Sequence, residues 1–452
     1  MRVSIIGAMS GHGPRVAITG LGVVSPYGVG RDCFWRHVSR GCSATRSIVD
    51  FDASPFPCTV AAPVPPVTID DGVMLTERAG DAPSFARDSR EPGPGKPPAG
   101  RADPRRYAKA SLIAVIAARE AWADAGLRLN EPDAGVLVGS GAGGIDVAER
   151  QYAEFFTDGW KRVTPYAIPV SIVGMVSSEI SIALELHGIS HVVSTGCTSS
   201  TDAIGYAASL IRSGEAEVIL SGGADACVTP GMIFGFSKMR VVATRYNDTP
   251  ASASRPFDRT RDGFVLGEGA WMVVLEREDR ARARGARVYA TVDGYGSTCD
   301  AYHRVQMNPD GEQIVRAMRL AIERSGRPVE DIGYVSYHGT STILNDAIEA
   351  RCVRELLGPG AARTPGSSTK SMIGHPQGAS GASGIVTTAL ALANGYLPPT
   401  INLEQQDPEC DHLDLLPLVG RSAEPVAALC NCLGFGSKNS AIVLGRAGVP
   451  VS

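Results

Sequence analysis

The sequence predicts an α/β fold made of two similar halves. Apolar segments rich in β-branched residues alternate with helical segments along the 452 residues. A strand–turn–helix with a reactive residue at its turn occurs twice, with Cys197 in the first half and His375 in the second. This order matches a duplicated βαβ plan, for which mainly parallel sheets with helices outside are expected.

The first half is expected to begin with a buried strand that ends in glycines, at 15–24. A helix follows at 105–125, because apolar side chains recur at helical spacing from Leu112 to Trp122 and Gly126 marks its end. The other predicted elements of this half are a helix at 32–38 and strands at 134–144, 217–224 and 269–276.

We divide the chain into an N-terminal extension at 1–14, a first half at 15–285 and a second half at 286–452. Between 61 and 104 the composition shifts to Pro, Gly and charge, which cannot bury enough apolar surface to order itself. That segment is predicted to be a long, mobile surface insertion. The second half alternates expected strands at 288–295, 332–337 and 441–445 with expected helices at 311–325, 345–357 and 379–394.

Composition argues against several classes of function. The net charge is -4 and no dense Lys/Arg stripe occurs, so no nucleic-acid partner is expected. No stretch approaches the run of about eighteen apolar residues that a membrane span needs. The ten cysteines lack a framework spacing, which indicates reduced thiols in a cytoplasmic protein. Their one close pair, Cys430 and Cys432, is a poor zinc signal, and no metal is expected.

A glycine pattern from Gly139 to Gly144 matches the short motif of dinucleotide-binding loops. No strand carrying an acidic residue follows about 20 positions later, as the ribose contact requires. We interpret these glycines as packing a turn.

The stretch at 191–205 carries the strongest chemical signal. It predicts a short buried strand, a sharp turn at Gly196 and a helix with Cys197 in its first turn. Unpaired N–H groups and the positive end of the helix dipole would face the sulfur. Such a placement is expected to lower the thiol pKa from its free value of about 8.5.

Three other motifs lie at predicted strand ends or helix starts, where α/β folds place their sites. One holds His338, one runs from Lys370 to His375, and the third is a late glycine-rich turn at 431–436. Two histidines and a lysine beside a cysteine form a set that a nucleophilic enzyme can use.

Together these motifs resemble the β-ketoacyl synthases of the thiolase superfamily, over 15–445. The matching text is Thr195-Gly-Cys-Thr-Ser199, Ser254-Arg-Pro-Phe-Asp258, Arg261-Asp-Gly-Phe-Val-Leu-Gly-Glu-Gly269, Asp300-Ala-Tyr-His303, His338-Gly-Thr-Ser-Thr342, Thr369-Lys-Ser-Met-Ile-Gly-His375 and Gly434-Phe-Gly436. The resemblance implies a thiolase fold, a duplicated five-layer αβαβα sandwich, and a dimer.

The resemblance also implies a decarboxylative Claisen condensation with malonyl-acyl carrier protein. Cys197 would take the acyl group, and the N–H groups of Cys197 and Phe435 would form the oxyanion hole. His338 and His375 would hydrogen-bond the thioester oxygen as it becomes an enolate. Lys370 would orient His375.

Further family positions concern the carrier. Thr340 and Thr342 match residues that contact the pantetheine arm, and Phe435 matches the gate beside the cysteine. Arg105, Arg106 and Lys109 match a basic helix that docks the acidic acyl carrier protein. No cofactor is implied, because the carrier's phosphopantetheine holds the substrates.

The motifs leave several alternatives. The Gly196–Cys197 elbow resembles the ketosynthase-alpha subunits of bacterial type II polyketide synthases, whose partner is a chain-length factor lacking the nucleophile. The alternative is a homodimeric fatty-acid elongating synthase. A thiolase using Cys432 is disfavoured by the His338 motif and Lys370. A non-catalytic chain-length-factor-like subunit is disfavoured by Cys197.

Two positions depart from the family pattern. Many fatty-acid versions place a Glu fourteen residues after the active-site lysine, where this chain has Gly384 (370 + 14). The late turn continues with Ser437-Lys438 where the family usually has Gly-Thr.

Overall fold

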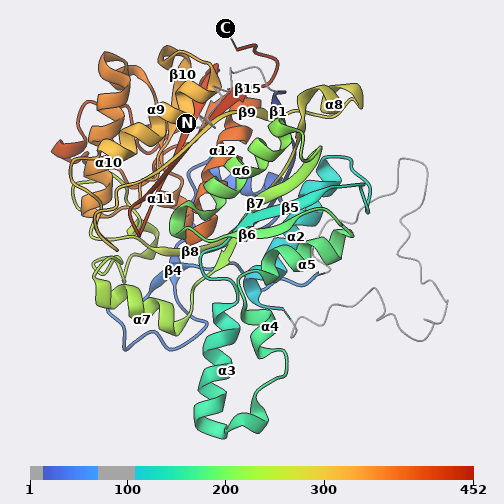
Figure 1. The fold of residues 1–452 in the computed structure, drawn as a ribbon. Helices are drawn as coiled ribbons and strands as arrows, with labels where there is room; N and C mark the ends of the chain where they lie inside the picture. Colours follow the sequence, from blue (N-terminus) through green and yellow to red (C-terminus); the bar gives the residue numbers. More distant parts are fainter. Residues whose placement is uncertain (1–13, 70–106, 452) are drawn as a thin grey trace, which may run out of the picture.

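The computed structural model describes residues 14–69 and 107–451 (Figure 1). Its main sheet follows the strand path β11-β10-β14-β15-β9-β1-β8-β7-β5-β6. The path consists of two five-stranded units that meet where β1 pairs with β9. The first unit contains β1 (Val16–Ser25), β5 (Gly135–Gly139), β6 (Ser190–Val193), β7 (Val218–Ala226) and β8 (Leu266–Arg277), and the second contains β9 (Ala290–Cys299), β10 (Ile332–Ser336), β11 (Gly366–Ser367), β14 (Ala427–Gly434) and β15 (Lys438–Arg446).

The two units have the same topology. Numbered along the chain, the strands of each unit lie in the spatial order third, second, fourth, fifth, first. The fifth strand, β8 or β15, runs antiparallel to both of its neighbours, and the other neighbouring pairs of each unit are parallel. The β1–β9 pair that joins the units is antiparallel too, so five of the nine neighbouring pairs on the path are antiparallel and the expectation of mainly parallel sheets is wrong.

Helices form three layers around the two units. Helices α6 (Ser199–Ser213) and α12 (Ser380–Asn394) pack against each other and against strands of both units, so they form the middle layer. Helices α2 (Lys109–Asp124) and α5 (Met175–Leu184) cover the first unit, and α9 (Glu312–Ser325) and α10 (Ile343–Leu357) cover the second. Buried apolar side chains form three clusters between these layers. The five-layer αβαβα fold is confirmed.

Glycines in the first strand of each unit let a helix approach the sheet closely. A Cβ atom at Gly22 would lie 1.9 Å from the carbonyl oxygen of Ala117 in α2. A Cβ atom at Gly294 of β9 would likewise lie 1.9 Å from the carbonyl oxygen of Ala321 in α9. The same packing device therefore occurs in both halves.

The remaining helices and strands lie around these layers. They are α1 (Arg31–Val38), α3 (Ile145–Asp158), α4 (Ala167–Ser171), α7 (Pro230–Met239), α8 (Glu278–Ala283), α11 (Lys370–Ile373), β2 (Gly28–Val29), β3 (Arg46–Ser47), β4 (Val60–Ala62), β12 (Tyr396–Leu397) and β13 (Arg421–Ser422). In Figure 1, α3 and α4 project from the body of the molecule. No helix in the described ranges is long and apolar enough to cross a membrane.

Two expectations about surface segments need correction. The segment at 61–64 is buried, and Ala61 in β4 pairs in parallel with Leu266 of β8. The physical reason is that Val60 and Ala61 pack into two neighbouring apolar clusters, with Val265 and Leu266 respectively. The surface insertion therefore cannot begin at 61, and 70–104 lies outside the described residues. The strand before the nucleophile, β6, is not buried, because it is the edge strand and only β5 pairs with it.

Candidate active site

Cys197 lies at a bend between the edge strand and a central helix. The chain leaves β6 at Val193, turns through the 3₁₀ segment Gly196–Thr198 and enters α6 at Ser199. Gly196 has a φ of 72°, a left-handed conformation that favours glycine. A Cβ atom at Gly139 would lie 2.3 Å from the Ser199 backbone, so Gly139 lets β5 approach the start of α6 closely.

His338 and His375 meet the cysteine from the second half of the chain. The Nε2 atom of His375 lies 3.2 Å from the Cys197 sulfur. The two imidazole rings are 5.3 Å apart and nearly perpendicular. One nitrogen of each ring and the sulfur all lie within 4.8 Å of one another, and the three residues are buried. One small carbonyl group can therefore contact all three side chains.

The loops that carry the histidines are fixed by backbone and carboxylate contacts. His375 follows α11, and its N–H and C=O pair with Val265 and Gly267 at the start of β8. His338 follows β10, and its backbone N–H donates to Glu349 at 2.7 Å. These hydrogen bonds fix the backbone positions of both histidines.

The electrostatics of Cys197 differ from the expectation. Burial raises the pKa of its thiol to about 11, and the N–H of Phe435, the Lys370 charge and its own N–H lower that pKa by less. The predicted lowering of the pKa is therefore wrong for the substrate-free protein, because desolvation outweighs the helix start. The N–H groups of Phe435 and Cys197 nevertheless both face the sulfur.

Both histidines are neutral near pH 7. Burial, and then the charge of Lys370, lowers the pKa of each imidazole well below 6.5. His375 Nδ1 is buried and has no hydrogen-bond partner among the described residues. Because nothing fixes the proton on Nδ1, His375 Nε2 is available as an acceptor or a donor.

Lys370 is a buried cation at the start of α11. Burial lowers the pKa of its ammonium group, and the nearby Cys432 and Glu349 oppose that shift. Within 14–69 and 107–451, Lys370 forms no ion pair. At Gly384, where many fatty-acid versions have a Glu, a Cβ atom would lie 3.1 Å from the Ser336 hydroxyl oxygen. The lysine charge is therefore free to act on the thiol and the imidazoles.

Buried carboxylates hold the candidate site together, although their role was not predicted from the sequence. Glu349 accepts from the N–H groups of His338 and Gly339, and burial raises its pKa to about 7. Asp346 accepts from the N–H groups of Thr340 and Ser341.

Asp225, at the end of β7, joins two glycine-rich loops. It accepts from the N–H groups of Gly141 and Gly378, at 2.8 and 2.6 Å. The available signal was an acidic residue at the end of an otherwise apolar strand.

The other candidate residues lie around this centre. The Thr340 and Thr342 hydroxyls are 2.9 Å apart on the loop that carries His338. Phe435 lies near Phe236, which in turn contacts Phe264, and Phe264 contacts the ring of His375. An aromatic series thus connects the candidate gate with His375.

The carrier-docking residues are only partly described. Lys109 forms a 2.5 Å ion pair with the buried Glu268. Arg105 and Arg106 lie outside the described residues.

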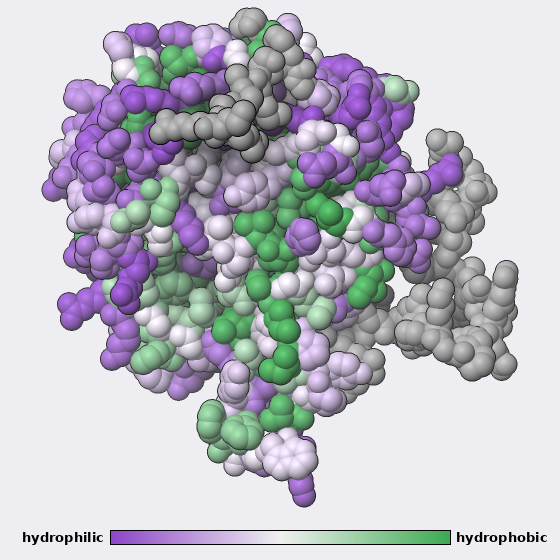
Figure 2. Space-filling model, viewed as in Figure 1, coloured by the Kyte–Doolittle hydropathy of each residue, from purple (hydrophilic) through white to green (hydrophobic). Residues whose placement is uncertain are grey.

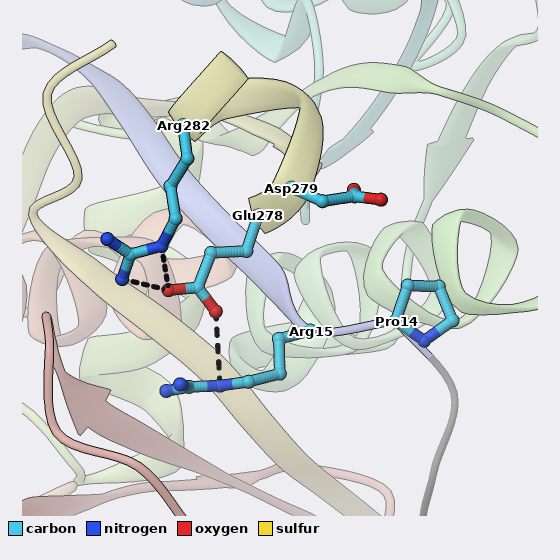
Figure 3. A pocket seen from close by; sticks show the side chains of 5 residues that line it. All are labelled: Pro14, Arg15, Glu278, Asp279 and Arg282. Atoms are coloured by element: carbon cyan, nitrogen blue, oxygen red, sulfur yellow. Dashed lines mark hydrogen bonds and ion pairs between the residues drawn. The ribbon is translucent and has the colours of Figure 1, made fainter. Parts of the chain in front are cut away.

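A surface pocket of about 290 Å³ between Arg15 and α8 is not part of this centre (Figure 3). Arg15 and Arg282, which line the pocket, both form ion pairs with Glu278, so these charged side chains already have partners.

Comparisons with known proteins agree with this geometry. The N-terminal domain of β-ketoacyl synthases matches residues 14–281, and their C-terminal domain matches 289–404. The chain is 38% identical to 3-oxoacyl-[acyl-carrier-protein] synthase 2 of Coxiella burnetii, over 96% of this chain and 98% of the relative.

Two polyketide proteins are similar as well. The tetracenomycin polyketide synthase ketoacyl synthase alpha subunit of Streptomyces glaucescens is 38% identical, over 96% of this chain and 97% of its own. The solved ishigamide ketosynthase/chain length factor superposes with a TM-score of 0.84 at 31% identity, covering 97% of this chain and all of that one. Fold, motifs and relatives agree, and the chain belongs to the β-ketoacyl synthase family of acyltransferases.

Proposed function

We propose that this β-ketoacyl synthase elongates polyketide chains in a type II system, with Cys197 as the acyl acceptor and His338 and His375 as the condensation pair. The observation that carries the proposal is the convergence of one thiol and two neutral imidazoles within 4.8 Å. Condensation itself is the activity of the family, and the proposal assigns the residues of this chain that perform it.

Acylation begins with a neutral thiol and a neutral imidazole. Because the pKa of Cys197 is about 11 and His375 Nε2 is 3.2 Å away, the thiol proton moves to that nitrogen as sulfur attacks the thioester carbonyl. The oxyanion forms beside the N–H groups of Cys197 and Phe435. Its collapse expels the carrier thiolate, which takes the proton back from His375.

Condensation then uses both histidines as donors. The malonyl thioester oxygen lies between the two Nε2–H groups, its carboxylate leaves as CO₂, and the electron pair becomes an enolate. The enolate carbon attacks the acyl-Cys197 carbonyl, and collapse expels the Cys197 thiolate, which takes up a proton from solvent. Neutral donors in a dry site stabilise the enolate without a full charge on the imidazole.

Three side chains support these steps. Lys370 raises the local positive potential where thiolate and enolate form, and it lowers the pKa of both histidines so that they stay neutral. Thr340 and Thr342 would contact the pantetheine arm from the loop that carries His338.

The proposal includes a carrier protein and a docking site. The Coxiella burnetii relative is named as a 3-oxoacyl-[acyl-carrier-protein] synthase, which supports a carrier-bound substrate here. Arg105 and Arg106 are the proposed docking residues. Lys109 contributes less, because its ammonium group already pairs with Glu268.

The assignment to polyketide synthesis rests on Gly196. Its left-handed φ of 72° suits glycine, and Gly-Cys at this elbow resembles the alpha subunits of type II polyketide synthases. The second candidate is a homodimeric fatty-acid elongating synthase, favoured by the equal identity to the Coxiella enzyme.

The partner surface includes the β6 edge and a neighbouring apolar face. Figure 2 shows hydrophobic surface along the middle of the molecule and down the projecting helices. Phe156 of α3 and Trp160 are 79% and 73% exposed, and Ile182 of α5 is exposed as well. A sheet edge without a second strand among the described residues, on a chain that also exposes large aromatic side chains, is not expected in a stable monomer.

The first prediction concerns that partner. Expressed alone, the chain is expected to elongate by no more than one or two cycles, and a related subunit lacking the cysteine is expected to form a heterodimer that elongates fully. Light scattering and the mass of carrier-bound products check this with and without the subunit. A homodimer that elongates fully alone would favour the fatty-acid candidate.

The second prediction concerns Ser437, two residues after Phe435. Its hydroxyl donates to the His303 carbonyl at 2.8 Å and accepts from the His303 N–H at 3.2 Å, despite an unfavourable φ of 64°. Ser437→Ala keeps the strained backbone φ but loses both hydrogen bonds to His303, each of which contributes about 1 kcal/mol to the stability of the turn. Acylation of Cys197 is therefore expected to slow about tenfold in single-turnover experiments, since Phe435 N–H is no longer held.

The matched control is Ser422→Ala, which removes an exposed serine hydroxyl from β13. It is expected to acylate at the wild-type rate. Acylation of Ser437→Ala at or above the wild-type rate would contradict the role of this contact.

A further inference from the structure

Cys432 is a buried thiol that the steps above do not use. It lies on β14, two residues before Gly434 at the end of that strand, and is 1% exposed. Its sulfur is 3.6 Å from Nδ1 of His338 and 3.1 Å from the carbonyl oxygen of Cys197. It therefore contacts the backbone of the nucleophile and the far side of one histidine ring.

The position of the proton on His338 decides what its other nitrogen can do. A neutral imidazole carries one N–H, so Nε2 donates only when Nδ1 is unprotonated and accepts. The partner of Nδ1 therefore sets the tautomer. Among the described residues, Cys432 is the one hydrogen-bond partner of this nitrogen.

Hydrogen-bond accounting indicates where the thiol proton goes. The Cys197 carbonyl lies two residues before α6, where the amide of Thr201, four residues later, is in place to donate to it. Nδ1 of His338 has no such substitute, and a buried acceptor without a donor costs about 1–3 kcal/mol. If the Cys432 thiol donates to Nδ1 of His338 and the amide four residues later donates to the Cys197 carbonyl, both acceptors have a donor.

The thiol is a dependable donor here because it stays protonated. Burial raises the pKa of Cys432 to about 12, against the lowering by Lys370. A thiolate at this place would instead require a proton on Nδ1 and leave Nε2 without one.

We propose that Cys432 is a positioning residue whose S–H group donates to Nδ1 of His338 and holds the tautomer that carries its proton on Nε2. The inference rests on the proposed function of His338 as a donor to the thioester oxygen. Cys432 does not touch substrate, and acylation of Cys197 through His375 does not depend on it. Its effect is confined to decarboxylation and condensation.

The direct test is the tautomer of His338 in the full-length protein. Imidazole ¹⁵N NMR of the ¹⁵N-histidine-labelled protein, with the His338 signals assigned through His338→Asn, is expected to show Nε2–H and a bare Nδ1. In Cys432→Ala the Nδ1–H form is expected to become the major one. A wild-type signal with the proton on Nδ1 would overturn the proposal, whatever any variant does.

The kinetic test separates this residue from a structural one. Cys432→Ala is expected to acylate Cys197 within twofold of wild type but to decarboxylate malonyl carrier protein about tenfold more slowly. Cys432→Ser, which restores an O–H donor, is expected to recover the rate and the Nε2–H tautomer. Equal losses of acylation and decarboxylation, or no recovery with serine, would count against the proposal.

The control variant is Cys430→Ala. Cys430 lies on the same strand and faces the same side of the sheet, but its thiol donates to Thr388. It leaves a cavity of the same size and is expected to change neither the tautomer nor the ratio of the two rates. If His338→Ala itself decarboxylates normally, the proposed function of His338 fails, while the NMR result still decides the role of Cys432.

Discussion

Replacing Cys197 by alanine is expected to abolish both acylation and condensation, at least 10³-fold below wild type. No other cysteine in the described ranges has a histidine nitrogen and two backbone N–H groups at its sulfur. Incubation with an acyl carrier protein substrate, followed by digestion and mass mapping, is expected to find the acyl group on Cys197 alone.

The control for this variant is Cys299→Ala, which removes an exposed thiol. It is expected to retain the acyl adduct and full activity. Cys432 is the residue on which a thiolase-type mechanism would depend, but its sulfur faces the Cys197 carbonyl oxygen and Nδ1 of His338, whereas the Cys197 sulfur faces two backbone N–H groups. Acyl transfer to Cys432, or an active Cys197→Ala protein, would contradict the assignment.

The order of elements and the reactive residues were predictable because both depend on local patterns. Strand–glycine–helix signals placed Cys197 and His375 at turns, and the structure brings His338 to them. The helix predicted at 379–394 is α12, which begins at Ser380 and ends at Asn394. Such features are determined by short stretches of sequence, so they can be predicted without knowing the tertiary contacts.

Features that depend on distant contacts were not predictable. The fifth strand of each unit is as apolar as its neighbours, so its antiparallel direction leaves no mark in the sequence. The pKa of Cys197 depends on how deeply α6 is covered by α12, which no local pattern reports. Asp225 and Glu349 are acids whose partners lie on other loops, so their role becomes visible only when those loops meet.

The two histidines are expected to be separable by the step they affect. Among the described residues, His375 is the one side chain at 3.2 Å from the sulfur that can take the thiol proton, so His375→Ala is expected to slow acylation and condensation alike. His338→Ala leaves that pair intact. It is expected to acylate near the wild-type rate and to lose about 10²–10³ in decarboxylation and condensation, the usual cost of one oxyanion donor.

The pH dependence tests the same assignment, because each imidazole works in its neutral form. Burial lowers both histidine pKa values well below 6.5, so activity is lost only as pH falls through those lowered values. Neither imidazole is therefore expected to produce an inflection between about pH 6.5 and 8, and an inflection near pH 7 is expected only from Glu349, whose pKa is about 7. Single-turnover rates of wild type, His338→Ala and His375→Ala across that range provide the measurement. An inflection that disappears in either histidine variant, or an acylation defect in His338→Ala as deep as that of His375→Ala, would show that the roles are assigned wrongly.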